Sequence, residues 1–525
     1  MIKDKRNIKS LFFLYSLLAL MFFSGCYSFE EKKEPREQDK GQLTLFMNGP
    51  EDASSDITFA LSAINIISED GLPMDILDDP REINSFAVEG HQLLLAERLV
   101  PAGKYDSIRL VIRKALIKKE GRPANLALPA EDVEIPLNIT VNRQQNISIF
   151  INWNPDGSVV DGYMFKPAFT TRSQSPELNT LLIYVTNEDS DNVSVINKNS
   201  GAVVATIMVG KKPRGIAAAL KGERSRIFVA NSGSNTISVI DPTTNRVENE
   251  ISIRFGRKPE GIAVATVSSG KELVFVTNYD TNSVSVIDST TFQEIEKIDV
   301  GQGPVAVAVD PPVENFLGSR YIGIEDASIL RSYRERYFNV YVVNMNSNDV
   351  SVIRIDKTTN RSVEVIDLPV EWKPSSLTVD YKRGKVYVVN YGSDKLSVLD
   401  IVKICKGIIN GAVSTINDVG NFIRGVVADP AFDRIYLLKE MPGELMIIRP
   451  FSDSFDTLKS VMPPIMGIIP VGDSPRSFIS GPENRKLYVV NRGSNTISVV
   501  DKTTRKEEQV IHVGRKPYGI AIFQN

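Results

Sequence analysis

The chain is poor in the residues that most often hold metals and cofactors. Its 525 residues include two histidines, His91 and His512, and two cysteines, Cys26 and Cys405. A tetrahedral zinc site needs three or four Cys, His or carboxylate ligands, and covalent haem needs a C-x-x-C-H motif, which is absent. We therefore expect no cofactor and no metal. His91, His512 and Trp153 are predicted to be packing, surface or strand residues.

The chain also has no large excess of positive or negative side chains. The 61 Lys and Arg residues nearly balance the 64 Asp and Glu residues, for a formal net charge of -3. The whole chain is thus not drawn to nucleic acid, and any electrostatic function must be local. Because Cys26 is expected to be lipidated, as the next paragraph explains, Cys405 is expected to have no disulfide partner and is predicted to be a small buried apolar side chain.

The N-terminal apolar run, Leu11 to Phe23, is too short to span a bilayer as a stable helix. It follows a basic segment, which is typical of a secretory signal peptide. The run ends in Phe23-Ser24-Gly25-Cys26. These residues resemble the bacterial lipobox, which implies a signal peptide over 1–25, cleavage before Cys26 and lipidation of that residue. An ordinary cysteine after an ordinary signal peptide is the alternative, since Phe23 stands where Leu is more usual.

Residues 26–40 are predicted to be a charged tether, because residues 27–40 carry five acidic and four basic side chains and few apolar ones. The lipid bilayer is then the partner of an acylated Cys26, and several acyl chains hold a protein on a bilayer far better than one. Since Tyr27 and not Asp follows the cysteine, the resemblance to lipoproteins of two-membrane bacteria favours the outer membrane. The side and leaflet of that membrane stay open.

Residues 41–171 show the alternating pattern of half-buried strands, as in 107–113 and 146–151, with turn residues between the runs. This predicts an N-terminal antiparallel β-sandwich. Around Val100–Tyr105 and Phe165–Pro167 the segment resembles a domain of unknown function found after lipobox cysteines in bacterial lipoproteins. The polar, aperiodic residues 171–180 are predicted to separate it from the next domain.

From Leu181 to Asn525 one phrase repeats seven times: an apolar strand ending in Asn, a short polar loop, and a second apolar strand containing Ser. The copies NSGSNTISVID (231–241) and NRGSNTISVVD (491–501) agree at nine of eleven positions. Short amide side chains suit tight hairpin loops, so the shared Asn and Ser residues are interpreted as hairpin chemistry. The sixth copy lacks them, with Lys439, Gly443 and Met446 in their places, and is interpreted as a degenerate unit.

These phrases resemble the YVTN-repeat β-propellers, which implies an all-β fold with a seven-bladed propeller over 181–525. Apolar runs after each proline or loop supply an inner strand for each blade. The last run, 519–523, has no blade after it and is predicted to complete the first blade. Such closure would leave no exposed sheet edge at either end.

The loops that cross from one blade to the next are rich in basic and aromatic residues, and alternating strand direction gathers them at one mouth of the channel. We predict that they form a basic collar, surrounded by acidic loops farther out, that favours an anionic group. Turn chemistry and solvated surface charges are the alternative. The candidate ligand-binding residues are Lys211, Lys212, Arg214, Arg257, Lys258, Trp372, Lys373, Arg424, Arg476, Arg515, Lys516 and Tyr518.

The favoured function is a non-catalytic binding module whose partner is an envelope protein, a polysaccharide or an anionic ligand. A propeller enzyme of the dehydrogenase, reductase or lyase type is one alternative, and a pure scaffold is another. The long connection from Pro311 to Phe338 is predicted to project from the face opposite the collar, either as a partner site or as a solvated excursion.

Overall fold

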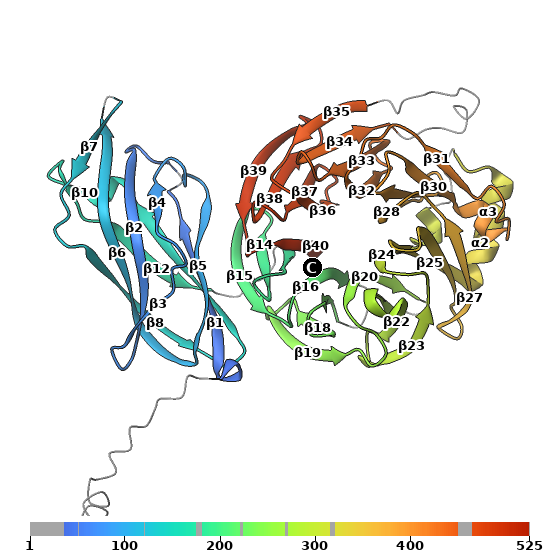
Figure 1. The fold of residues 1–525 in the computed structure, drawn as a ribbon, viewed down its shortest axis with the longest axis horizontal. Helices are drawn as coiled ribbons and strands as arrows, with labels where there is room; N and C mark the ends of the chain where they lie inside the picture. The colour runs from blue at the N-terminus through green and yellow to red at the C-terminus, as the bar shows by residue number, and fades with distance from the viewer. Residues whose placement is uncertain are drawn as a thin grey trace, which may run out of the picture.

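The structure, a computed structural model, describes residues 36–523 apart from 51, 120, 175–180, 221–223, 268–270, 316–320 and 450–464. Cys26 and the predicted signal peptide lie outside these residues. Figure 1 shows two β-rich bodies side by side, a sandwich and a ring of small sheets. A short 3-10 helix, η1 (Glu37–Asp39), precedes the first strand of the sandwich.

The sandwich is built from two sheets whose apolar faces enclose one core. One has the order β12-β9-β1-β5, and the other has the order β3-β2-β6-β7, with β4 beside β2 and β8 beside β6. Trp153 is buried in this core, edge-on to Phe59 at 5.0 Å. The strands are β1 (Lys40–Asn48), β2 (Ile57–Ser68), β3 (Pro73–Asp75), β4 (Arg81–Asn84), β5 (Gln92–Pro101), β6 (Gly103–Lys119), β7 (Arg122–Leu126), β8 (Asp132–Val141), β9 (Asn146–Asn154) and β12 (Ala168–Ser173), with η2 (Asp156–Ser158) and the small hairpin β10 (Val159–Val160) and β11 (Met164–Phe165) after β9.

The expectation of a purely antiparallel sandwich needs one correction. β1 and β9 pair in parallel, from Gln42 opposite Asn146 to Asn48 opposite Asn152. A parallel pair needs a long connection, and here the rest of the second sheet provides it.

The ring is a seven-bladed propeller, as the repeats predict. Each blade is one four-stranded antiparallel sheet. In chain order the blades are β13 (Leu182–Asn187), β14 (Asn192–Asn197) and β15 (Ala202–Met208) with β40 (Pro517–Phe523); β16 (Pro213–Ala219), β17 (Arg226–Asn231), β18 (Thr236–Asp241) and β19 (Arg246–Ser252); β20 (Pro259–Thr266), β21 (Glu272–Asn278), β22 (Ser283–Asp288) and β23 (Glu294–Asp299); β24 (Pro304–Val309), β25 (Tyr337–Asn344), β26 (Asp349–Asp356) and β27 (Arg361–Pro369); β28 (Pro374–Asp380), β29 (Lys385–Asn390), β30 (Leu396–Asp400) and β31 (Val413–Ile416); β32 (Ile423–Asp429), β33 (Arg434–Lys439), β34 (Glu444–Ile448) and β35 (Ile465–Pro470); and β36 (Pro475–Ser480), β37 (Lys486–Asn491), β38 (Thr496–Asp501) and β39 (Lys506–His512). The sixth, degenerate copy forms a complete blade.

The two middle strands of each blade are buried because neighbouring blades cover both of their faces. The second strand carries an aromatic residue at the same position in all seven blades, and every one is at most 2% exposed. These rings pack between the sheets, where large apolar side chains bury the most area. They are Tyr184, Phe228, Phe275, Tyr341, Tyr387, Tyr436 and Tyr488.

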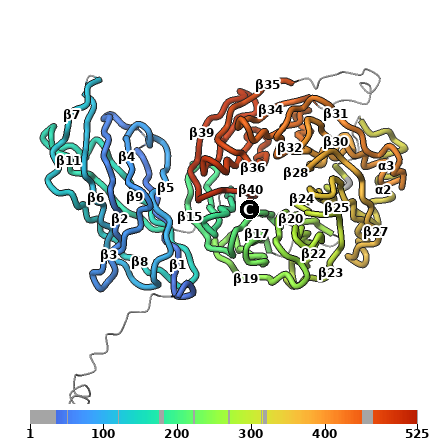
Figure 2. The backbone as a smooth tube through the Cα atoms, viewed as in Figure 1, coloured from blue at the N-terminus to red at the C-terminus, as the bar shows by residue number. Residues whose placement is uncertain are grey.

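The C-terminal strand closes the ring. β40 pairs with β13, from Leu182 opposite Phe523 to Asn187 opposite Pro517, and it forms the innermost strand of the first blade. Figure 2 shows the end of the chain beside the channel, next to the start of the propeller. The predicted closure is therefore confirmed.

The described part of the long connection after β24 is not a solvated excursion, which corrects that expectation. It contains η5 (Val313–Asn315) and α2 (Ile324–Arg336), and α2 packs against α3 (Ile401–Cys405), the helix after β30. Leu330 is 1% exposed and shares a core with Ile404 and neighbouring strands. Cys405 is free and half-buried beside Asn339, and burial raises the pKa of its thiol to about 12.

The sandwich docks onto the outer edge of the first blade. Phe46 and Phe150 stack at 5.6 Å and join a core that includes Ile183 and Tyr488 of the propeller. Buried hydrogen bonds surround this apolar centre, among them the one between the hydroxyls of Ser148 and Thr206 at 2.7 Å. A centre this apolar, ringed by satisfied polar groups, is typical of a stable interface.

Candidate functional site at the channel mouth

The crossing loops share one backbone feature. The residue just before each inner strand of blades 2 to 7, and of β40, has a positive φ of 45° to 64°. An L residue in this left-handed region costs roughly 1–2 kcal/mol relative to ordinary helical backbone, so glycine would be the least strained choice. Glycine occurs once and lysine four times: the residues are Lys212, Lys258, Gly303, Lys373, Phe422, Ser474 and Lys516.

The repeated Asn and Ser residues hold these loops in place. In blade 2, the side-chain nitrogen of Asn231 donates to the Ser238 hydroxyl at 2.9 Å, and the same pair occurs in the five other blades that keep the motif. The second repeated residue, Asn235, accepts a hydrogen bond from the backbone N–H of Lys258 at 2.7 Å. Four further blades repeat this contact. The motif therefore joins each blade to the next, which extends the predicted hairpin role.

One side of the channel mouth holds a network of charges. The Arg214 guanidinium donates to Glu188 at 2.7 Å and also pairs with Glu260. Tyr518 donates its hydroxyl hydrogen to Glu260 at 3.2 Å and accepts a hydrogen bond from Arg476. Both guanidiniums lie over the Tyr518 ring, at 5.2 and 4.4 Å from its centre. Such contacts stabilise a cation near an aromatic face.

Burial and the ion pairs act on these groups in opposite directions. Burial alone would raise the pKa of Glu188, but the guanidiniums of Arg492 and Arg214 outweigh it and the pKa is lowered. Burial opposes the charged form of Arg214, yet Glu260 and Glu188 raise its pKa. Burial raises the pKa of Tyr518, so its hydroxyl stays protonated and remains a donor. Glu188, expected on an outer acidic rim, is only 4% exposed and belongs to this inner network.

Arg424 stands among the other residues that line the channel. It donates to Glu440 at 2.6 Å, and its guanidinium lies 3.7 Å from the centre of the Tyr391 ring. The cavity at this mouth measures about 300 Å³, and Glu260, Arg424, Arg476 and Tyr518 are among its lining residues. No carboxylate lies within ion-pair distance of Arg476 in the part of the chain that the structure describes.

The remaining predicted residues do not all face the channel. Lys211 pairs with Glu37 at 3.0 Å, and Arg515 lies 3.6 Å from Asp78, so both point to the sandwich, which corrects their place in the collar. Lys516 pairs with Asp189 at 2.6 Å.

The other collar residues lie on exposed loops. Lys258 lies over the ring of Tyr279, and Lys373 lies over that of Trp372, which is 56% exposed. For Lys212, Arg257 and Lys373 the described residues provide no ion pair. The predicted collar is thus largely neutralised, and Arg476 and these loop cations are the exceptions.

Within the described ranges, no group of three or more His, Cys, Asp or Glu side chains could hold a metal ion. The same residues include no helix long and apolar enough to cross a membrane. His91 is exposed on the sandwich and His512 lies in β39, half-buried. Burial and then the charge of His91 lower the pKa of His512.

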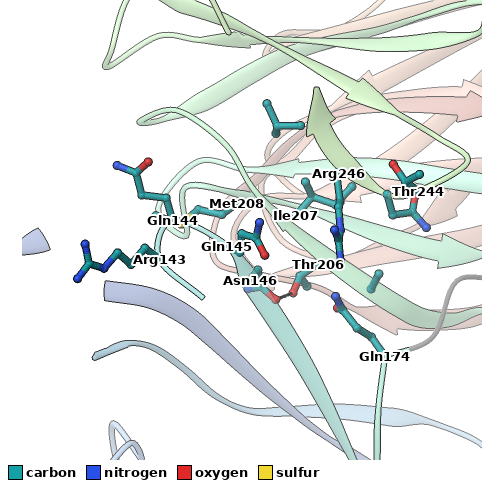
Figure 3. A pocket seen from close by; sticks show the side chains of 13 residues that line it. Arg143, Gln144, Gln145, Asn146, Gln174, Thr206, Ile207, Met208, Thr244 and Arg246 are labelled. Atoms are coloured by element: carbon teal, nitrogen blue, oxygen red, sulfur yellow. Dashed lines mark hydrogen bonds between the residues drawn. The ribbon is translucent and has the colours of Figure 1, made fainter. Parts of the chain in front are cut away.

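A second concavity, which the sequence reasoning missed, lies between the two domains (Figure 3). Its volume is about 370 Å³. The sandwich contributes the β8–β9 turn with Gln145 and the start of β9 with Asn146, and the propeller contributes β15, the turn before β19 and the start of β19 with Arg246. The amide-rich segment 142–146 was the only signal for it in the sequence, because the groove exists only where the domains meet.

Comparisons with known proteins match parts of the chain. Residues 40–167 match the family described as "Domain of unknown function (DUF4382)". A stretch of 56 residues is 48% identical to part of PE-PGRS family protein PE_PGRS18 from Mycobacterium tuberculosis, strain ATCC 25618 / H37Rv, and covers 11% of each protein. This chain therefore spans about a tenth of that relative.

Solved structures resemble about two thirds of the chain. A functionally unknown protein from Desulfotomaculum acetoxidans DSM 771 is 12% identical, with a TM-score of 0.50 over 66% of this chain and 99% of its own. A protein from Lactobacillus plantarum is 13% identical, with a TM-score of 0.48 over 66% and 100%. Hydrazine synthase from Kuenenia stuttgartiensis is 17% identical, with a TM-score of 0.47 over 61% and 92%. The first similarity supports the fold alone, and the two lower scores add nothing to it.

Proposed function

We propose that this protein is a lipoprotein of the cell envelope whose propeller binds an anionic group at the channel mouth without catalysing a reaction. The observation that carries the proposal is Arg476. Its guanidinium lines the cavity and lies over Tyr518, and no carboxylate among the described residues lies within ion-pair distance of it, although Glu260 binds the same Tyr518 hydroxyl. Arg424 lines the same cavity. A cation in a partly enclosed site attracts anions more strongly than one in open water.

Calorimetric titration of the purified full chain with citrate tests this site. We expect measurable binding that Arg476→Gln weakens at least tenfold, because the variant keeps a polar side chain but loses the charge. Lys486→Gln, on β37 and paired with Glu508 outside the lining, is the matched control and should bind like the wild type. Equal binding by wild type and Arg476→Gln would contradict the proposed function.

The anchor rests on Cys26 and the lipobox resemblance. Metabolic labelling with radioactive palmitate should mark the wild-type protein, and Cys26→Ala should abolish the label and release the protein from the membrane fraction. Label retained by Cys26→Ala would contradict lipidation at this position. Separation of inner and outer membranes then tests the proposed outer-membrane location.

Two other functions remain as competing proposals. A propeller enzyme would require a reactive group or cofactor at the same mouth, and metal analysis with an absorption spectrum of the purified protein distinguishes it from a binding module. A pure scaffold would bind partner proteins with no contribution from Arg476.

A further inference from the structure

Most of the side chains that line the groove between the domains carry a hydrogen-bond donor, and four of the thirteen are apolar. Its thirteen lining residues include two arginines, four side-chain amides of Gln and Asn on the sandwich and one on the propeller, and no acidic or aromatic residue. Figure 3 shows the Arg246 side chain extending toward Thr206 and Gln174 across the groove. A donor-lined groove is complementary to a ligand rich in acceptor oxygens.

The orientation of three amides follows from their hydrogen bonds. Gln174 accepts from the backbone N–H of Ser148 at 3.1 Å, Gln145 accepts from the side-chain nitrogen of Asn142 at 3.2 Å, and Asn245 accepts from the Tyr184 hydroxyl at 2.7 Å. Each hydrogen bond fixes which end of the amide is the oxygen, and the NH₂ end of each amide is then available to donate to a ligand. Burial raises the pKa of Tyr184, so that hydroxyl stays a donor and keeps Asn245 in this orientation.

The acceptors on the floor of the groove are also occupied. The Asn146 nitrogen donates to the side chains of Gln42 and Thr44, both at 2.9 Å, and its oxygen accepts from the Thr206 hydroxyl. Thr206 also pairs with Ser148 at 2.7 Å. These contacts are buried or partly buried at the domain interface, and they fix the side chains of the floor in place.

Arg246 provides an unneutralised charge at the groove. It is exposed, and no acidic side chain among the described residues forms an ion pair with it. Arg143 lies 3.4 Å from Asp39, an exposed pair that neutralises it only weakly. A guanidinium recognises a carboxylate through two parallel hydrogen bonds, so Arg246 is suited to the acidic group of a ligand.

We propose that this groove binds an acidic saccharide, with the sugar carboxylate on Arg246 and hydroxyl or ring oxygens on the amide groups of Gln145, Gln174 and Asn245. The donors come from a sandwich turn, the end of β12 and a propeller turn, so a ligand that contacts all three bridges the two domains. The volume of about 370 Å³ is within the range of small-molecule sites. This site is separate from the channel mouth and needs both domains.

Calorimetry on the purified full chain tests the proposal with disaccharides of galacturonate, glucuronate and mannuronate, and with galactose and inorganic phosphate as controls. At least one acidic disaccharide should bind at least tenfold more tightly than either control. Arg246→Gln and Gln174→Ala should each weaken that binding, the former at least tenfold, while Arg476→Gln should leave it unchanged. Arg246 and Gln174 are not in the core, and unchanged melting temperatures verify folding.

Three results would overturn the proposal: no binding of any acidic disaccharide, equal binding of phosphate or galactose, or full binding by Arg246→Gln. If Arg476→Gln lost saccharide binding and Arg246→Gln kept it, the sugar would bind at the channel mouth. That result would overturn this site and support the proposed function. If citrate binding failed but the saccharide results were as expected, the proposed function would be overturned and the groove proposal would be unaffected.

Discussion

The side-chain amide of Gln92 in the sandwich pairs with both backbone groups of Val203 in the first blade. Its oxygen accepts from the Val203 N–H at 2.9 Å, and its nitrogen donates to the Val203 carbonyl at 3.2 Å. The amide thereby takes the place of a neighbouring strand at the outer edge of β15. Because both residues are buried, their hydrogen bonds have no water to replace them.

Gln92→Ala should loosen the two domains. Leaving the buried groups of Val203 without partners should lower the free energy of unfolding by about 1–3 kcal/mol, as measured by urea denaturation. Arg122→Ala, an exposed change on β7, is the control and should change stability by less than about 0.5 kcal/mol. A Gln92→Ala protein as stable as the control would contradict a structural role for this pair.

Glu97 should make the domain interface sensitive to pH. Burial raises the pKa of this carboxyl, against the hydrogen bonds from Ser190 and Asn192 and the charge of Arg515. The folded state then binds the proton more tightly than the unfolded state, so this contribution to stability is complete below about pH 4.5 and is lost as pH rises through the raised folded pKa. Glu97→Gln imitates the protonated group and should remove that dependence.

The test compares the free energy of unfolding of wild type and Glu97→Gln between pH 4 and pH 8. The variant should become the more stable protein as the pH rises, and the difference should shrink at acidic pH. A difference that does not change with pH would show that Glu97 titrates normally.

Removing the closing strand should disrupt the ring. Deletion of residues 515–525 would expose the inner edge of β13, because β40 is its only partner on that side among the described strands. We expect aggregation or a large drop in melting temperature, since an open edge pairs with other chains. Deletion of residues 524–525 alone is the control. A protein truncated at 514 that melts like the full chain would disprove the closure argument.

The glycines of the crossing loops should not tolerate a methyl group. A Cβ at Gly256 would lie 2.2 Å from Cγ of Asn278, one of the repeated asparagines. Gly256→Ala should therefore destabilise the protein by about 1–3 kcal/mol in thermal or urea unfolding. Gly103→Ala, where no atom lies within 4 Å of the new Cβ, is the matched control. Equal stability of the two variants would mean that the asparagine moves without cost.

The blades could be predicted from the sequence because each repeats the same environment. An aromatic residue between sheets, an Asn that binds a Ser, and an inner strand after the crossing recur at fixed spacing, so seven weak signals reinforce one another. The closing strand could be predicted because the apolar run 519–523 is followed by no further blade. These are local or repeated features, and a linear pattern records them well.

Contacts between segments that are distant in the sequence could not be predicted, because they leave no repeated pattern in it. The parallel pairing of β1 with β9 joins strands about a hundred residues apart, and nothing near either strand marks it. Lys211 and Arg515 belong to crossing loops by sequence, but the docked sandwich supplies carboxylates that turn them from the channel. The groove beside Arg246 exists only because of the same docking.

The hydrogen bond from the Gly519 N–H to the Thr186 hydroxyl, 2.8 Å long, joins residues 333 positions apart. A protein exported from its N-terminus would deliver the first blade long before the strand that completes it. The first blade therefore keeps one edge unpaired until almost the whole chain is available to fold. If the proposed signal sequence directs export, folding of the ring would follow export, and a chaperone that covers strand edges would act in the interval between them.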